Sequence, residues 1–234
     1  MAITQSSALS QLRSRLGERG SGSETVGVWT NPELRVYLNE AQREIARRSE
    51  ALSKSTTISV SANTQTGTAP TDMVRIHKVD WYTSSTGSRY PLEYRDRDNL
   101  DRLWGTAEVL SRGTPEFWTF DGYPGGSGVI TLFPTPGVNG TLKVYYYAFP
   151  ADLATDTSAA SSNMTIPSGW EDLLIDYAEF RALRQNRQAA EAQEALAQFE
   201  MRLAGLVDAS TKWTDQPGQF INDPFYNVDD WGVW

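Results

Sequence analysis

The chain has 234 residues, of which 39% are hydrophobic and 21% charged, and its formal net charge is −8. This apolar content suffices for a packed core, and no run of about 18 apolar residues occurs, so neither a disordered chain nor a membrane-spanning helix is expected. Because it has no cysteine and a single histidine, His77, the chain offers no disulfide, thiolate zinc site or thiol nucleophile, and most zinc hydrolases are excluded.

The charge is distributed unevenly. Residues 151–210 carry ten acidic and four basic residues, and residues 211–234 carry four and one, so the acidity belongs to the C-terminal third. A protein that grips DNA by its phosphates needs clustered basic side chains. The main cluster consists of Arg43, Arg47 and Arg48, which we interpret as the solvated face of a helix. We therefore expect no specific binding of DNA.

Two helices are predicted first. Leucines spaced three and four residues apart predict a helix over residues 7–18, which the glycines and serines of residues 17–23 end. The second is predicted from Asn31, as the N-cap, with Pro32 and Glu33 in its first turn, to near Leu52.

After Ser55 the pattern changes to the alternation that is typical of strands. Strands are predicted over residues 56–60, 73–82, 90–94, 116–120, 129–133 and 142–149, with a short helix over 97–104. Within 73–82, Ile76 is expected to share a face with Lys78 and Asp80, opposite Val79 and Trp81. Short strands with turn-rich connections favour an antiparallel sandwich or barrel.

Two further helices follow a polar, low-complexity stretch over residues 152–163. Apolar residues at helical spacing run from Trp170 to Leu183 and again from Ala192 to Leu206. Periodicity stops at Lys212, and the last 24 residues contain helix breakers together with large apolar side chains.

The predicted fold class is therefore α+β, with a four-helix bundle as its core, an inserted antiparallel β-sandwich or barrel-like domain, and an extended C-terminal arm. The expected divisions are residues 1–51 for the first bundle helices, 52–150 for the β domain, 151–210 for the second bundle helices and 211–234 for the arm. Two unrelated domains are the alternative, but an isolated pair of helices buries little core.

The sequence contains few candidates for catalytic or ligand-binding residues. Glu171 and Asp172 could act as an acid–base pair in a hydrolase, although carboxylates are common in the first turn of a helix. Aromatic residues of the β domain, including Trp81 and Trp118, could form a platform that stacks on sugars or could be core. We predict no catalytic residues, no metal site and no cofactor. A carbohydrate-binding module with these aromatic residues as its platform is one functional hypothesis.

The C-terminal arm is the strongest candidate for binding. A disordered tail is normally poor in aromatic residues, whereas large apolar side chains concentrate at interface hot spots. We expect the arm to dock either on its own domain or on another protein chain. The candidate docking residues are Trp213, Phe220, Ile221, Phe225, Tyr226, Trp231 and Trp234.

Three stretches, in this order and spacing, resemble one family. They are WTNPEL at 29–34 running into LNEAQREIA at 38–46; VITLFPTP at 129–136 followed by LKVYYY at 142–147; and IP at 166–167 followed by WEDLL at 170–174 and YA at 177–178. The chain resembles the head-to-tail connector, or adaptor, proteins of tailed bacteriophages.

The resemblance implies a structural virion protein of the neck, made in the host cytoplasm, with no enzymatic step. Copies would form a homo-oligomeric ring beneath the portal, of about twelve if it follows the portal's symmetry. The helical bundle would line or surround the DNA channel, and the β domain would lie outward or toward the tail. The partners would be the portal protein, reached by the C-terminal arm, and a downstream tail or neck protein. DNA would pass through without specific binding. The alternative function is that of a carbohydrate-binding β module of a tail accessory protein.

Overall fold

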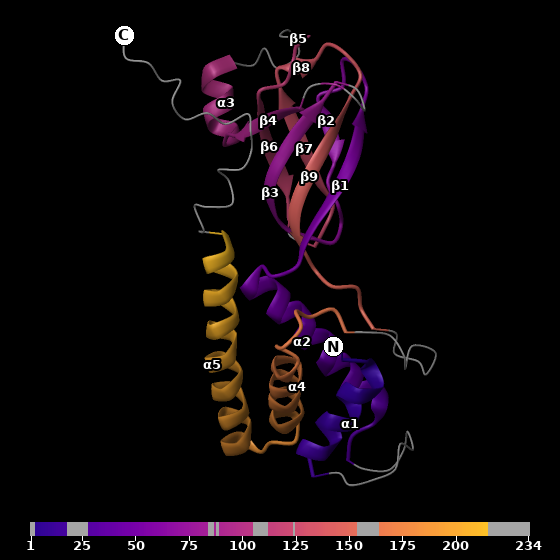
Figure 1. The fold of residues 1–234 in the computed structure, drawn as a ribbon, viewed down its shortest axis with the longest axis vertical. Coiled ribbons are helices and arrows are strands. Elements are labelled where there is room, and N and C mark those ends of the chain that lie inside the picture. Colours follow the sequence, from indigo (N-terminus) through magenta and orange to yellow (C-terminus); the bar gives the residue numbers. More distant parts are fainter. Residues whose placement is uncertain are drawn as a thin grey trace.

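The computed structural model describes residues 3–17, 28–83, 87, 89–104, 112–123, 125–153 and 164–214. All helices except one short helix gather at one end of an elongated molecule, and the strands lie with that short helix at the other end (Figure 1), which makes it a mixed α+β protein. The helices are α1 (Gln5–Arg15), α2 (Asn31–Ser49), α3 (Arg97–Trp104), α4 (Asp172–Gln185) and α5 (Ala189–Thr214). The strands are β1 (Ser53–Val60), β2 (Thr66–Thr68), β3 (Met73–Tyr82), β4 (Arg89–Tyr94), β5 (Arg112–Gly113), β6 (Phe117–Gly122), β7 (Gly128–Phe133), β8 (Thr135–Pro136) and β9 (Gly140–Ala148).

The start of α2 differs by one residue from the prediction. Thr30, not Asn31, is the N-cap: its hydroxyl accepts from the Glu33 N–H at 3.4 Å, and Glu33 Oε2 accepts from the Thr30 N–H at 2.8 Å. This reciprocal pair is a capping box, which satisfies two backbone donors at the helix start. Asn31 is free for another role, and its side-chain oxygen accepts from Arg13 Nε at 3.0 Å. That contact ties α1 to the start of α2.

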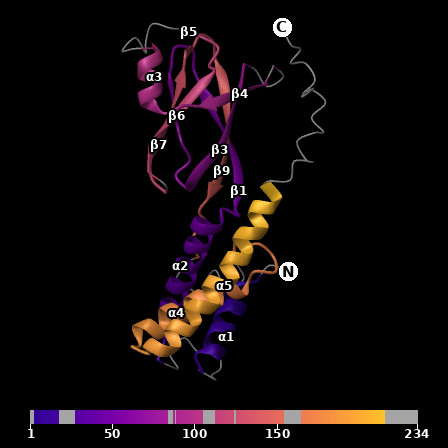
Figure 2. The ribbon, with the colours of Figure 1, turned by 90° about the vertical axis from the view of Figure 1, so that its left-hand side faces the viewer.

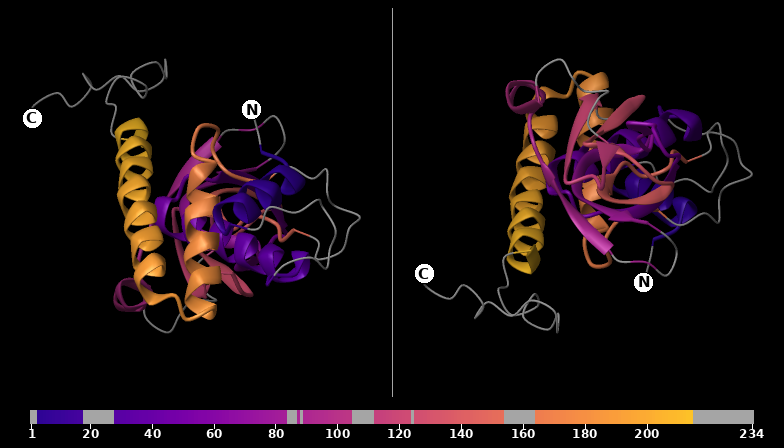
Figure 3. Two further views of the ribbon diagram at one scale, coloured as in Figure 1. Left: turned by 90° about the horizontal axis from the view of Figure 1, so that it is seen from below. Right: turned by 90° about the horizontal axis from the view of Figure 1, so that it is seen from above.

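α1, α2, α4 and α5 share one apolar core. α4 contacts the other three helices, and Figure 3 shows it lying between α5 and the pair α1 and α2. The four helices are unequal, with 11, 19, 14 and 26 residues. We call this group the helical unit, and the geometry of a four-helix bundle stays a prediction. The largest side chains with essentially no exposure in this core are Leu12, Leu34, Leu38, Leu173 and Phe199.

The strands form a seven-stranded sheet in the order β1-β9-β3-β4-β6-β7-β2, with β5 and β8 paired apart from it. The outermost strands β1 and β2 contact each other, so the sheet is nearly closed into a barrel. We call it the β unit. Its buried core includes Trp81, Trp118, Ile130, Leu132 and Leu142.

The prediction of a purely antiparallel sheet is wrong at one position in the main sheet. β4 and β6 pair in parallel, through Glu93 opposite Phe117 and Tyr94 opposite Trp118. Parallel neighbours need a long crossover connection, often a helix, and the chain between these strands contains α3. The small β5–β8 pair is also parallel.

The predicted alternation along β3 is interrupted by bulges. Register shifts fall between Met73 and Arg75 and between Ile76 and Lys78. A bulge adds an unpaired residue and thereby changes which face the next side chain occupies. Ile76 therefore lies opposite the buried Tyr146, whereas Lys78 lies opposite Tyr145 on the outer face. The expectation that Ile76 and Lys78 share a face is wrong for this reason.

The last helix is longer than the sequence indicated. α5 continues to Thr214, so residues 211–214 belong to a helix rather than to the arm as predicted. Near this end the Ser210 hydroxyl donates to the Ser49 carbonyl at 3.1 Å, which fixes α5 against the end of α2. The arm that remains is residues 215–234, which lie outside the described residues.

Candidate functional site

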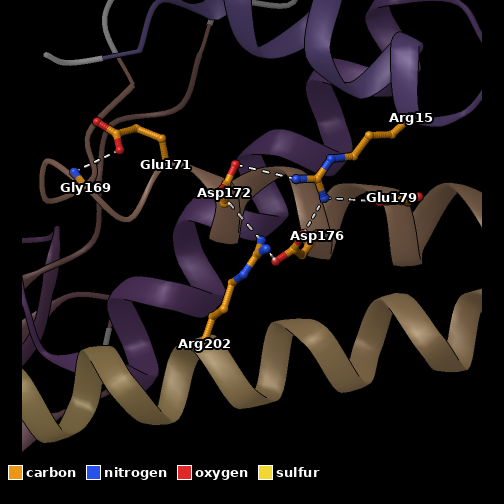
Figure 4. Close-up of polar contacts among 7 residues, drawn as sticks. All are labelled: Arg15, Gly169, Glu171, Asp172, Asp176, Glu179 and Arg202. Atoms are coloured by element: carbon orange, nitrogen blue, oxygen red, sulfur yellow. Dashed lines mark hydrogen bonds and ion pairs between the residues drawn. The ribbon is translucent and has the colours of Figure 1, made fainter.

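The densest group of charges in the helical unit lies on α4. Asp172, Asp176 and Glu179 are spaced four and three residues apart, so they share one face of the helix. Figure 4 shows Arg15 of α1 reaching this face from one side and Arg202 of α5 from the other. The group therefore connects three helices, and we call it the α4 ion cluster.

Asp176 lies at the centre of the α4 ion cluster, with a side chain that is 1% exposed. It accepts from Arg15 and, at 2.5 Å, from Arg202 Nη1. Arg15 also lies 3.4 Å from Glu179 and 3.5 Å from Asp172, whereas Arg202 lies 3.8 Å from Asp172. A buried carboxylate is tolerated only when it is paired and hydrogen-bonded, and this one has two guanidinium partners.

The electrostatics of the cluster follow from burial and pairing. Burial lowers the pKa of Arg15, but the hydrogen bond and charge of Asp176 outweigh that effect and leave the pKa of the guanidinium raised. Burial raises the pKa of Glu179, which the charge of Arg15 only partly opposes. The arrangement holds the charges in fixed ion pairs between helices, which is typical of a structural role.

The predicted acid–base candidates are each engaged in a structural contact. Glu171 Oε2 accepts from the backbone N–H of Gly169 at 2.8 Å, and Asp172 belongs to the α4 ion cluster. Figure 4 shows the two carboxylates directed to different partners. Their positions therefore give no support to the hydrolase hypothesis.

The basic cluster on α2 is paired with carboxylates. Arg48 makes two hydrogen bonds of 2.6 Å to Glu200 on α5, Arg47 pairs with Glu44 at 2.7 Å, and Arg43 pairs with Asp152. Neighbouring carboxylates thus offset the positive charge of all three arginines. This supports their interpretation as a helix face and not as a phosphate-binding stripe.

The aromatic platform proposed for the β unit does not form as the carbohydrate hypothesis requires. Trp81 and Trp118 are both buried in the core of the β unit. Tyr94 is 54% exposed and packs edge-on against Trp118, with ring centroids 5.0 Å apart. Trp81 is therefore not available to a sugar, and Trp118, which is 5% exposed, offers too little of its ring to stack on one.

The predicted docking residues fall mainly outside the described residues. Trp213 lies in the last turn of α5, and the other six candidates belong to residues 215–234. Figure 1 shows that α5 ends beside the junction of the helical unit and the β unit. The structure thus places Thr214, the residue that precedes the arm, whereas the docking residues of the arm itself lie outside the described residues.

The sequence patterns did not indicate that Arg15, Asp176 and Arg202 form a cluster. The signal for Asp176 was present, because an aspartate stands inside the apolar run that continues through α4. Buried charges need partners, so such a position predicts basic side chains on neighbouring helices. The identity of those partners depends on packing between segments that are far apart in sequence.

None of the helices in the described part of the chain is long and apolar enough to cross a membrane. The sequence profile of a family described as SU10 adaptor protein matches residues 4–219. Among solved structures, a chain described as belonging to the neck of an empty GTA particle, computed with C6 symmetry, is similar over 76% of this chain and 80% of that chain. The identity is 14% and the TM-score 0.28. No curated protein matches the sequence.

Proposed function

We propose a function that follows from the family of this chain, which belongs to the SU10 adaptor proteins, a family of bacteriophage head-to-tail adaptors. In this proposal, copies of the chain form a ring that joins the portal vertex of the capsid to the tail. The observation that carries this proposal is the family match, which extends over residues 4–219 and so includes both the helical unit and the β unit. The ring would be a structural component of the virion neck, and its work would be assembly, with no bond-making step.

The ring would also form part of the DNA conduit. A channel that passes DNA must not hold it, because each phosphate gripped by a basic side chain strengthens binding through counterion release. The pairing of the α2 arginines with Asp152, Glu44 and Glu200 supports this role, as does the acidic C-terminal third of the chain. We infer that the four helices, packed as a bundle, surround the channel and that the β unit lies outward or toward the tail.

The C-terminal arm would provide the contact with the portal protein, and a downstream tail or neck protein would bind the opposite side of the ring. Residues 215–234 contain Phe220, Phe225, Tyr226, Trp231 and Trp234, and aromatic residues dominate interface hot spots. The ring of about twelve copies expected from the resemblance belongs to this proposal.

The arm can be tested in the full-length protein with the double substitution Trp231→Ala and Trp234→Ala. We expect portal capture in a pull-down to weaken by roughly tenfold or more, since hot-spot residues contribute about 2 kcal/mol or more each. Cooperative thermal unfolding should be retained. The matched control is Tyr123→Ala, which removes an aromatic ring that is 82% exposed in the β unit. Unchanged capture, or a loss of cooperative unfolding, would contradict the role of the arm in docking.

A further inference from the structure

A cleft of about 600 Å³ opens on the side of the β unit between β3 and β6. Its lining is mostly apolar and aromatic, with two basic residues at one wall. The lining includes Val74, Arg75, Ile76, His77, Trp118 and Phe120. The cleft is separate from the α4 ion cluster, and no part of the proposed function uses it.

The cleft exists because one strand of the sheet is too short. β4 pairs with β3 only from Val79 to Tyr82, and with β6 only at Phe117 and Trp118. β4 ends at Tyr94, but β3 and β6 both continue past it toward the helical unit. Figure 2 shows β6 and β7 on one side of this opening and β3 and β9 on the other.

The width of the opening matches one strand. Neighbouring strands lie about 4.8 Å apart, and β4 pairs with both β3 and β6, so those two strands lie roughly 9–10 Å apart where β4 ends. An extended segment that continued the line of β4 could pair with both open edges, which is the geometry of β-strand addition. Met73 also lines the cleft, and its carbonyl accepts from the Gly125 N–H at 2.7 Å.

The arm begins close to this cleft. Ser210 near the end of α5 contacts Ser49, and the next residue, Glu50, pairs with Arg75 of the cleft wall at 2.5 Å. From Thr214 an extended chain of the arm's length can span roughly 65–70 Å, which far exceeds the distance required. A tethered segment also has a high effective concentration at a site within its reach.

The composition of residues 215–234 suits the cleft. The segment contains four aspartates and no lysine or arginine, together with large apolar residues. Its large apolar side chains match the aromatic lining of the cleft, which includes Trp118 and Phe120. In water the same side chains would form an exposed apolar patch, which is a liability in a free subunit.

We propose that the cleft between β3 and β6 binds residues 215–234 of the same chain as an added strand before assembly. The arm would then leave the cleft when it reaches its partner in the particle. Binding of the arm in the cleft depends only on the cleft and on the sequence of the arm, whereas its release during assembly rests on the proposed function.

The chain has no cysteine, so disulfide trapping can test this in the full-length protein without a background. Val74→Cys in the cleft is combined with either Val228→Cys or Val233→Cys in the arm. The matched controls combine the same arm positions with Val138→Cys, which is exposed at the far end of the β unit. Oxidation with copper phenanthroline is followed by non-reducing electrophoresis, and circular dichroism of the reduced proteins confirms folding.

We expect one of the Val74 pairs to form a disulfide within a single chain roughly tenfold faster than its Val138 control, in the absence of portal. Equal rates for the two positions would overturn the proposal. A product that consists mainly of cross-linked dimers would also overturn it, because the occupant would then be the arm of a second copy.

Discussion

Asp176 is the charged residue at the centre of the α4 ion cluster. It is buried, and it pairs with arginines from two other helices. Asp176→Asn leaves both guanidinium groups facing a neutral amide at a buried position. Removing one partner of a buried pair is strongly destabilising, so we expect the free energy of unfolding in urea to fall by about 3 kcal/mol.

Asp172→Asn is the matched control, because it alters the same α4 ion cluster at a side chain that is 62% exposed. Exposed ion pairs contribute about 1 kcal/mol or less, so the control should lose much less stability. Equal losses for the two variants would contradict the central role of Asp176.

At this scale the sequence could predict the presence of a buried acid but not its partners. An aspartate within an apolar helical run requires a positive partner. Arg15 and Arg202 lie 161 and 26 residues from Asp176 in the sequence, and no local pattern links them.

Among the helices and strands, α2 has a start whose capping box can be tested directly. The pKa of Glu33 is lowered because its carboxylate accepts from the backbone N–H and the hydroxyl of Thr30. Thr30→Ala removes the N-cap hydroxyl, so we expect the free energy of unfolding at pH 7 to fall by about 1 kcal/mol.

The effect of Thr30→Ala should depend on pH. A depressed carboxyl pKa contributes stability that is present above the unfolded value of about 4.3 and is lost as the pH falls through the folded value. The difference between wild type and variant, measured by urea unfolding, should therefore shrink below about pH 4. Ser10→Ala, at an exposed position inside α1, is the control and should change stability by about 0.5 kcal/mol or less. A difference that grows as the pH falls would contradict the capping box.

The sequence predicted the elements better than their pairing. The predicted strand over residues 73–82 has the same bounds as β3, and the predicted helix over 97–104 the same bounds as α3, because alternation and helical spacing are local. The parallel β4–β6 pair and the bulges of β3 were not predicted. Both depend on contacts between distant segments, and the open cleft is a consequence of how those segments pair.

The whole molecule is an elongated adaptor that consists of a helical unit, a β unit and an aromatic arm. The order of these parts was predicted from the sequence because helical and strand patterns change sharply near residues 52 and 150. The predicted docking residues could be proposed only from composition, since they lie almost entirely in the arm. The function of these parts together depends on contacts with other copies of the chain and with partner proteins.

Copies of this chain are proposed to form a ring on the portal. Electron microscopy of the purified protein mixed with its portal protein tests this proposal most directly. We expect ring-shaped density beneath the portal, coaxial with it and open along the axis, with the helical unit around the channel. Particles that show bare portals, beside a protein that stays monomeric, would contradict it.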